Sequence, residues 1–394
     1  MRHTKIILLC FHLCLLTGCE HLGYYNQAVT GHLGIMFSSQ PVEALLDDPQ
    51  TPQVLRQQLL LAEKILQYAE VKLLLDADGK YGRYVQLKDD YVVWNVFAAQ
   101  PVKLRGETWC YPVAGCAPYK GFYAKEDALA FADKYQHLGF ETYVGGVSAY
   151  STLGWFNDPL LSSFIHYQPL SLAELLFHEL AHSKVWVPGS VSFNESFASF
   201  VGRQGAWEYS QSALVVEPDA YTQWLEQKRQ WQVFKGFALQ IKADLEEIYA
   251  GVQGQTKNTA EIFAQRQRYL VQIQSCYEKN KVNLGGGRYD NLMRTRLNNA
   301  FLVSLGTYED FFPAFEQLFR QSQRDWGEFY MQVAALAKLS AQERTAKLAQ
   351  LLEAASAMDE TFSGGLGEQQ VAAQANDNNA EQVHCDAFSN HGLN

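Results

Sequence analysis

Residues 171–205 constrain the chain more than any other segment, and they read SLAELLFHELAHSKVWVPGSVSFNESFASFVGRQG. Ser171 and Glu174 have the spacing of a capping box, which predicts that a helix begins there and continues through His182. On such a helix His178 and His182 are four residues apart, so both imidazoles project from one face, one turn from each other. Two ring nitrogens placed in this way can bind a single Zn²⁺.

Glu179 directly follows the first histidine. Its carboxylate would reach a water molecule on the open side of the metal, where it can act as a general base. Leu175, Leu176 and Leu180 make the surroundings of this carboxylate apolar. Burying a carboxylate among leucines is costly unless a cation lies beside it, and a metal supplies that cation. The alternative is an amphipathic core helix whose histidines are only hydrogen-bonded.

A third protein ligand would leave one coordination position open for water. After a turn at Pro188 and Gly189 a second helical pattern begins, for which Asn194 is the predicted N-cap. Glu195 would then lie in the first turn of that helix, so we expect a His₂Glu site that holds one Zn²⁺ per chain. A carboxylate favoured only by the helix dipole is the alternative for Glu195. Glu174 is the competing carboxylate, but we assign it to the helix cap.

The first nineteen residues, MRHTKIILLCFHLCLLTGC, combine a short basic start with an apolar run of signal-peptide length. The run is too short to span a bilayer as a stable helix. Its end before Cys19 resembles the lipobox of bacterial lipoproteins, which implies that residues 1–18 are removed and that Cys19 carries acyl chains. Glu20 at the next position favours the periplasmic side of an outer membrane. An ordinary signal peptide is the alternative.

Charge and composition exclude some classes of protein. Acidic residues outnumber basic ones by 42 to 32, which argues against a nucleic-acid binder because such proteins need a basic surface. Hydrophobic residues make up 47% and charged residues 19%, the balance of an ordinary globular chain. The one long apolar run lies at the N-terminus, which excludes a polytopic membrane protein.

The distribution of residue types along the chain predicts an α+β fold that is mainly helical. Residues 19–40 are expected to be a tether packed on the body, and residues 41–350 a single domain. A composition rich in Gly, Gln, Asn and Ala predicts a disordered tail at residues 356–394.

Within this domain, residues 80–160 have short aromatic and β-branched stretches that indicate a small mixed sheet, with a helix at 125–138 and a strand at 140–150. Residues 170–350 are expected to be a helical part that contains the zinc site. Apolar periodicity there predicts further helices at residues 218–251, 259–279, 288–305 and 338–355.

Two cysteines lie close together in the segment WCYPVAGC. Export would allow Cys110 and Cys116 to close a small disulfide loop. A metal knuckle is the alternative, although no second Cys or His pair lies nearby in the sequence. The spacing alone leaves both open, and we prefer the disulfide.

HELAH followed by FNESFASF resembles the gluzincin metallopeptidases, which include the large alanyl-type aminopeptidases. The resemblance implies a zincin-like core, with His178, His182 and Glu195 as zinc ligands and Glu179 as the base. More widely, the chain resembles a family of bacterial lipoproteins described as predicted zinc aminopeptidases. The segments that carry this wider resemblance include YYNQAVTGHLG, VVWNVFAAQ, AYSTLGWFNDPL and LNNAFLVSLGTYEDFFPAF.

The chain departs from the large aminopeptidases at three points. Twelve residues separate His182 from Glu195, fewer than in those enzymes. Ser199 lies one turn after Glu195, where several relatives have an Asp that orients a histidine. The Gly-x-Met-Glu-Asn segment that holds the substrate amino group is absent. Residues 145–159 lie in roughly its place, and we expect them to form either an edge strand that pairs with an extended peptide or an inner strand.

These observations together predict zinc-dependent hydrolysis of peptide bonds, and the resemblance favours an aminopeptidase. The alternatives are a zinc endopeptidase, a hydrolase of cell-wall amides, and a non-catalytic binding or scaffold lipoprotein with a structural zinc helix. A hydrolase would also need a hydrogen-bond donor for the oxyanion, for which Tyr289 and Tyr308 are candidates.

Overall fold

The computed structural model describes residues 23–362 apart from 112–114, 150–156, 213, 215–218, 254–257 and 306–310. The predicted leader with Cys19, the chain from residue 363 onward and Tyr308 therefore lie outside the described residues. So does the middle of the expected 145–159 strand, whose first three residues end β7.

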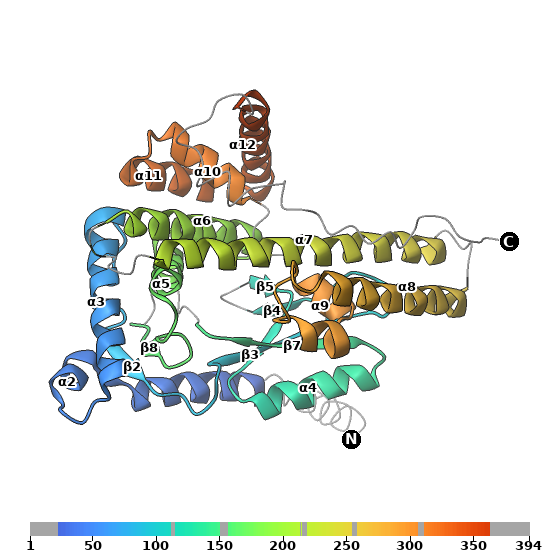
Figure 1. Cartoon of the computed structure of the whole chain (residues 1–394), viewed down its shortest axis with the longest axis horizontal. Helices are drawn as coiled ribbons and strands as arrows, with labels where there is room; N and C mark the ends of the chain where they lie inside the picture. Colours follow the sequence, from blue (N-terminus) through green and yellow to red (C-terminus); the bar gives the residue numbers. More distant parts are fainter. Residues whose placement is uncertain are drawn as a thin grey trace, which may run out of the picture.

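Among the described residues, short strands form three small sheets (Figure 1). The first, in the order β1-β2-β8, comprises β1 (Gln40–Pro41), β2 (Arg83–Val85) and β8 (Leu160–Leu161). The second is antiparallel, in the order β6-β3-β7, and comprises β3 (Val93–Ala99), β6 (Lys120–Phe122) and β7 (Glu141–Val147). The third is a hairpin of β4 (Trp109–Tyr111) and β5 (Gly115–Ala117).

Side chains of the β6-β3-β7 sheet alternate between its two faces, and each face is covered by a helix. One face packs against α4 (Lys125–His137) through a cluster that comprises Trp94, Val96, Phe122, Ala128 and Ala132. The other face packs against α9 (Asn299–Ser304) through Phe97, Ala99 and Ala300. Figure 1 shows α4 and α9 on opposite sides of the sheet.

The largest apolar core lies where helices from distant parts of the chain meet. It joins α3 (Gln53–Leu73), α5 (Pro169–Lys184), α6 (Val191–Ser210), α10 (Phe312–Gln321), α11 (Trp326–Ala337) and α12 (Ala341–Phe362). A second core lies between α7 (Ala220–Gln253) and α8 (Thr259–Asn280). The short α2 (Val42–Asp47) follows β1, and residues 23–38 form a helix before it.

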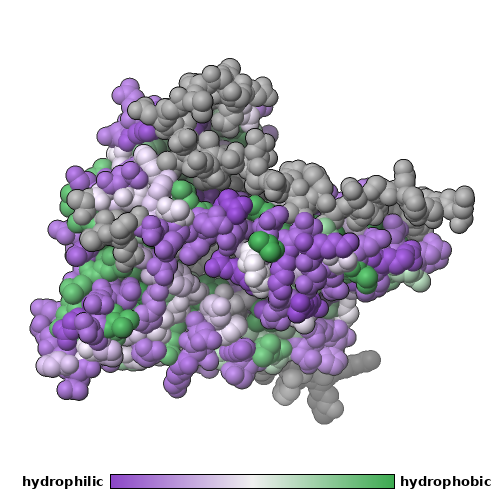
Figure 2. All heavy atoms as spheres, viewed as in Figure 1, coloured by the Kyte–Doolittle hydropathy of each residue, from purple (hydrophilic) through white to green (hydrophobic). Residues whose placement is uncertain are grey.

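The predicted class, α+β and mainly helical, is confirmed. The helices expected at 125–138, 218–251 and 259–279 are α4, α7 and α8. The part of the surface seen in Figure 2 is mostly hydrophilic, with apolar atoms in small patches. Within the described ranges, no helix has both the length and the apolar character needed to cross a membrane.

The prediction of one helix over residues 288–305 is wrong. The chain instead forms the π-helix η1 (Leu292–Arg296), leaves helical geometry at Leu297, and starts α9 with Asn298 as N-cap. The reason is tertiary. Arg296 and Asn298 donate side-chain hydrogen bonds to the carbonyls of Val144 and Thr142 at the edge of β7, and these contacts replace helical continuation.

Candidate metal centre

Helix α5 carries both predicted histidine ligands, but it begins earlier than expected. Its first residue is Pro169, whose missing N–H suits a first helical turn. The predicted capping box is therefore wrong. Instead of bonding the helix start, Glu174 accepts hydrogen bonds from Trp224 Nε1 at 2.8 Å and Lys228 Nζ at 2.5 Å, both on α7.

Helix α6 carries Glu195, and its start also differs from the prediction. The N-cap is Ser190 and the first helical residue is Val191, so Asn194 is not the cap and Glu195 lies beyond the first turn. Asn194 is fully buried and fixes the connecting loop: its Oδ1 accepts from Val187 N at 2.8 Å, and its Nδ2 donates to Val187 O at 2.9 Å. This clamp accounts for the tight connection between α5 and α6.

The three expected ligands converge on one point. The Nε2 atoms of His178 and His182 are 3.2 Å apart. Glu195 Oε2 is 3.4 Å from His178 Nε2, and Glu195 Oε1 is 3.7 Å from His182 Nε2. A tetrahedral Zn²⁺ with ligands at about 2.0–2.1 Å has ligand atoms roughly 3.3 Å apart. Among the described residues this is the one group of His, Cys, Asp or Glu side chains that could hold a metal ion, and its spacing fits zinc.

Two glycines allow α6 to lie against α5 at the site. A Cβ at Gly202 would come 2.8 Å from the backbone O of Glu174 and 3.2 Å from the Cβ of His178. At Gly205 it would come 2.8 Å from the ring of Phe177. Neither glycine was among the residues predicted for the site. Their spacing of three in VGRQG is the signal of a small-residue helix face.

Burial and mutual charge set the protonation of the ligands. Burial, together with the charge of His178, lowers the pKa of His182 to about 4, so this ring is neutral and able to bind a metal. Burial alone would raise the pKa of Glu195, but the hydrogen bond to His178 and the charges of both histidines lower it. Glu195 is therefore an ionised candidate ligand.

Compensation at Glu179 is too weak to offset its burial. Burial, with the charges of Glu195 and Asp158, raises its pKa to about 7 against the opposing effect of His178. Leu176 and Leu180 beside it are 0% and 1% exposed. A carboxylate held in this way is the kind of group that a nearby metal ion would stabilise, which agrees with the spacing of the ligand atoms.

The environment of His182 lacks one common feature of metal-binding histidines. Such a ring usually donates its second N–H to a carboxylate or a carbonyl. Nδ1 of His182 is buried without a hydrogen-bond partner among the described residues. Ser199, one turn after Glu195, is half-buried on α6.

The β4–β5 hairpin lies next to the loop that leads into α6. A disulfide joins Cys110 to Cys116, which face each other across the two strands. Gly115 has φ +80°, and a Cβ there would come 2.7 Å from the N atom of Gly189. β5 thus packs directly on the α5–α6 loop at Gly115, where only a residue without a side chain fits.

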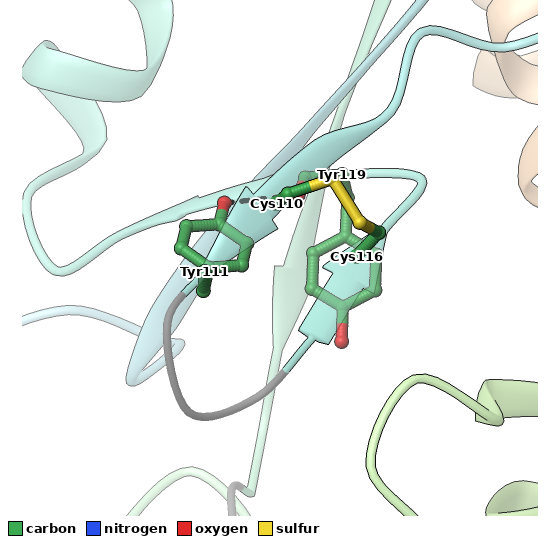
Figure 3. Close-up of a disulfide and its surroundings, with 4 residues drawn as sticks. All are labelled: Cys110, Tyr111, Cys116 and Tyr119. Carbon is green, nitrogen blue, oxygen red and sulfur yellow. Dashed lines mark hydrogen bonds between the residues drawn. A yellow bond between two sulfur atoms is a disulfide. The ribbon is translucent and has the colours of Figure 1, made fainter.

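Tyr119 follows this hairpin and was not among the predicted site residues. Burial raises its pKa to about 12, with a further contribution from the carboxylates of Glu195 and Glu179, so the phenol stays protonated. Tyr111 Oη donates to its backbone O at 3.2 Å. Figure 3 shows the Tyr119 hydroxyl directed away from the disulfide. Nothing in its local sequence distinguishes it from the other tyrosines.

The earlier tyrosine candidate is elsewhere. Tyr289 stacks on Phe234 with ring centroids 3.6 Å apart and packs against the α7–α8 core. It is a packing residue and not part of the metal centre.

The fold and the site together define an α+β protein with a candidate His₂Glu metal centre between two helices. The family model described as "Putative aminopeptidase" matches residues 23–348, and the chain belongs to this family. The matched range includes both helices of the site and the sheets. The family name indicates a peptidase with a peptide substrate. No curated protein and no solved structure matched the chain.

Proposed function

We propose that the protein is a zinc-dependent aminopeptidase with a zincin-like core, anchored in the bacterial cell envelope by acyl chains on Cys19. One observation carries the catalytic part of the proposal: His178, His182 and Glu195 bring their ligand atoms within 4.8 Å of one another. Glu179 lies beside them on α5, in a chain that belongs to an aminopeptidase family.

The chemistry of the proposal follows from the donor set. When bound by the three ligands, Zn²⁺ would lower the pKa of a water molecule and polarise the substrate carbonyl. Glu179 takes the proton from the attacking water and passes it to the departing amine. The leucines around Glu179 exclude bulk water, which strengthens the interactions between the charges of the site.

Tyr119 is the proposed hydrogen-bond donor to the oxyanion that forms when water adds to the peptide carbonyl. Its support is that Glu195 and Glu179 contribute to its raised pKa and that it follows the hairpin whose Gly115 packs against Gly189 of the α5–α6 loop. The disulfide hairpin before it and the ring of Phe97, 5.6 Å away, hold it in place. Tyr119→Phe should lower kcat about a hundredfold, whereas Tyr289→Phe, in the α7–α8 core, should leave kcat unchanged.

The test of the reaction compares Glu179→Gln with wild type. Zinc per chain is measured first, followed by hydrolysis of aminoacyl anilides, of the same anilides with an acetylated amino end, of longer blocked peptides and of muropeptides. We expect one zinc in both proteins and a loss of about 10²- to 10⁴-fold in kcat for the variant. Glu208→Gln, the same change on α6 outside the site, is the control.

The substrate panel separates the alternatives. Cleavage that requires a free amino end supports an aminopeptidase, and cleavage of blocked peptides indicates an endopeptidase. Preference for muropeptides indicates a cell-wall amide hydrolase. Bound zinc with no hydrolysis of any substrate by wild type would replace the proposal with a binding or scaffold protein.

The proposed anchor has its own test. Cells fed a labelled fatty acid should incorporate it into the wild-type chain and not into Cys19→Ala, and fractionation should place the wild-type chain in the outer membrane. A wild-type chain that is cleaved but carries no label would show an ordinary signal peptide instead.

A further inference from the structure

The helix formed by residues 23–38 is fixed to the body by one of its faces. Gln27 Nε2 donates to Gly121 O, and Gln27 Oε1 accepts from Tyr123 N. Tyr24 packs edge-on against Phe122 with ring centroids 5.8 Å apart. A Cβ at Gly31 would lie 2.3 Å from the ring of Tyr123, so the helix lies directly on the strand β6 region. This helix cannot rotate about its axis without losing these contacts.

The opposite face of the same helix carries an exposed apolar stripe at a spacing of four. Its members are Tyr25, Val29, Leu33 and Phe37, which are 40%, 56%, 42% and 84% exposed. At 3.6 residues per turn, the stripe is centred about 180° from the residues that contact the body. It runs for about 18 Å along the helix. In Figure 1 this helix, in blue, lies along the lower edge of the molecule.

The helix itself carries no charged side chain. Residues 21–42 contain no Asp, Glu, Lys or Arg. The isolated exposed apolar residues of α3 differ in this respect, since Val71 is flanked by Glu70 and Lys72. A long uncharged apolar stripe exposed to water is the type of surface that binds another apolar phase.

The position of the stripe in the sequence indicates which apolar phase it contacts. The described part of the helix starts at Gly23, four residues after Cys19. Four residues reach at most about 14 Å when fully extended. Acyl chains on Cys19 would therefore hold the start of the helix at the bilayer surface.

We propose that the exposed face of helix 23–38 lies in the interfacial layer of the bilayer, with the stripe Tyr25, Val29, Leu33 and Phe37 inserted among the lipids. This inference rests on the proposed lipid anchor. Because the helix is fixed to the β6-β3-β7 sheet, the contact sets one orientation of the whole body on the membrane. The absence of Lys and Arg makes the contact depend on apolar burial and not on anionic lipid.

Two valines of similar exposure provide a matched test. Val29 lies in the stripe and Val71 lies on α3, with 56% and 63% exposure. The full-length acylated protein, as Val29→Cys or as Val71→Cys, is labelled with a fluorophore and reconstituted in vesicles of phosphatidylethanolamine and phosphatidylglycerol. Wild type carried through the same labelling gives the background. We expect quenching by lipid-borne nitroxide at Val29 only, and at least about threefold less quenching there by iodide than at Val71.

A second variant tests the energetics on the folded protein. Leu33→Gln with Phe37→Gln changes only exposed side chains, so the melting temperature should stay unchanged. The rate of transfer between vesicles should rise roughly tenfold or more, because apolar burial is lost. For wild type, we expect the same transfer rate between vesicles of phosphatidylcholine alone as between vesicles that contain phosphatidylglycerol, since no basic residue takes part.

Three results would overturn the inference. The first is an acylated protein whose Val29 label is as accessible to iodide as the Val71 label. The second is shielding of Val29 that rises with protein concentration at constant lipid, which would assign the stripe to a second copy of the chain. The third is an unchanged transfer rate in the double variant. Mass spectrometry of Cys19 separates these from a failure of the anchor itself, because only that failure leaves the cysteine unacylated.

Discussion

The helix pair α5–α6 and the helix pair α7–α8 are packed in different ways. Helix α6 meets α5 through Gly202 and Gly205, where an added methyl group would overlap its neighbours. The α7–α8 pair packs through large side chains such as Phe234 and Ile273, and Gly236 on α7 has nothing within 4 Å of an added Cβ. Of these two helix pairs, only α5–α6 shows a close approach of this kind, and it is the pair that carries the candidate metal ligands.

The two pairs also differ in buried charge. The α5–α6 interface includes Glu174, Glu179 and Glu195, of which Glu174 is paired with Lys228 at 2.5 Å and with Arg203 at 3.7 Å. Glu179 and Glu195 have only histidines as neighbouring bases. The α7–α8 core is mostly apolar, and its buried charge is already paired: Arg266 on α8 binds Glu141 on β7 at 2.7 Å. Tyr269 Oη donates to Asp244 Oδ2 at 2.6 Å. Metal binding should therefore affect the first pair and leave the second unchanged.

The largest expected effect is loss of the metal in Glu195→Gln. The amide keeps the shape of the side chain but removes the charge that binds the ion, so zinc affinity should fall by more than about a hundredfold and hydrolysis should stop. Zinc is measured after dialysis against a weak chelator. Asp244→Asn, the same kind of change in the α7–α8 pair, should keep one zinc. Wild-type zinc content in Glu195→Gln would show that this carboxylate is not a ligand.

Glu174→Gln comes next, because it leaves Lys228 and Arg203 without their partner. The side chain of Glu174 is 15% exposed, and breaking a buried pair on one side should cost about 3 kcal/mol of unfolding free energy. Asp244→Asn should cost under about 1 kcal/mol. Chemical unfolding near neutral pH measures both, and equal losses in the two variants would remove the difference between the helix pairs.

The pH dependence of this effect follows from the charge. Burial raises the pKa of Glu174, but Lys228, Arg203 and two hydrogen bonds lower it overall below its ordinary value of 4.5. A pKa that is lower in the folded state gives stability that is present above 4.5 and is lost as the pH falls through the folded value. The difference between wild type and Glu174→Gln should therefore shrink in acid.

The sequence predicted that His178, His182 and Glu195 come together, because coordination chemistry dictates both residue type and spacing. Coordination requires two histidines and a carboxylate wherever the helices begin. Errors in the predicted helix starts therefore did not change the choice of His178, His182 and Glu195. The role of Glu174 was different. The capping box is a local pattern, whereas Trp224 and Lys228 compete for this carboxylate from 50 and 54 residues away. No local pattern contains such partners.

The same limit explains the other misses. Tyr119 reaches the site because a hairpin packs on a distant loop, and the break between η1 and α9 depends on carbonyls of β7 that lie 152 and 156 residues away. Helical periodicity was a sound guide for α7 and α8, where a regular apolar face meets another one. It failed at 288–305, where tertiary hydrogen bonds outweigh it.

Gly202→Ala should have an intermediate effect. Its Cβ would lie 2.8 Å from the backbone O of Glu174, which cannot move as a flexible side chain can. The variant should lose about 1–3 kcal/mol of unfolding free energy. Because α6 would be displaced beside His178, zinc affinity should fall too. Thermal unfolding and zinc titration measure the two losses, and a stable variant with full zinc affinity would mean that the close approach is not needed for the site.

Gly236→Ala should have the smallest effect, and it should raise the unfolding free energy instead of lowering it. The same methyl group is added inside a helix, but here it meets nothing within 4 Å and the residue is exposed. Alanine reduces the conformational entropy lost on folding, so unfolding free energy should rise by about 0.5–1 kcal/mol with unchanged zinc affinity. Thermal unfolding alongside Gly202→Ala tests the contrast directly. If both variants lose stability to the same extent, helix packing in the two pairs is alike, and the metal centre needs another explanation for its spacing.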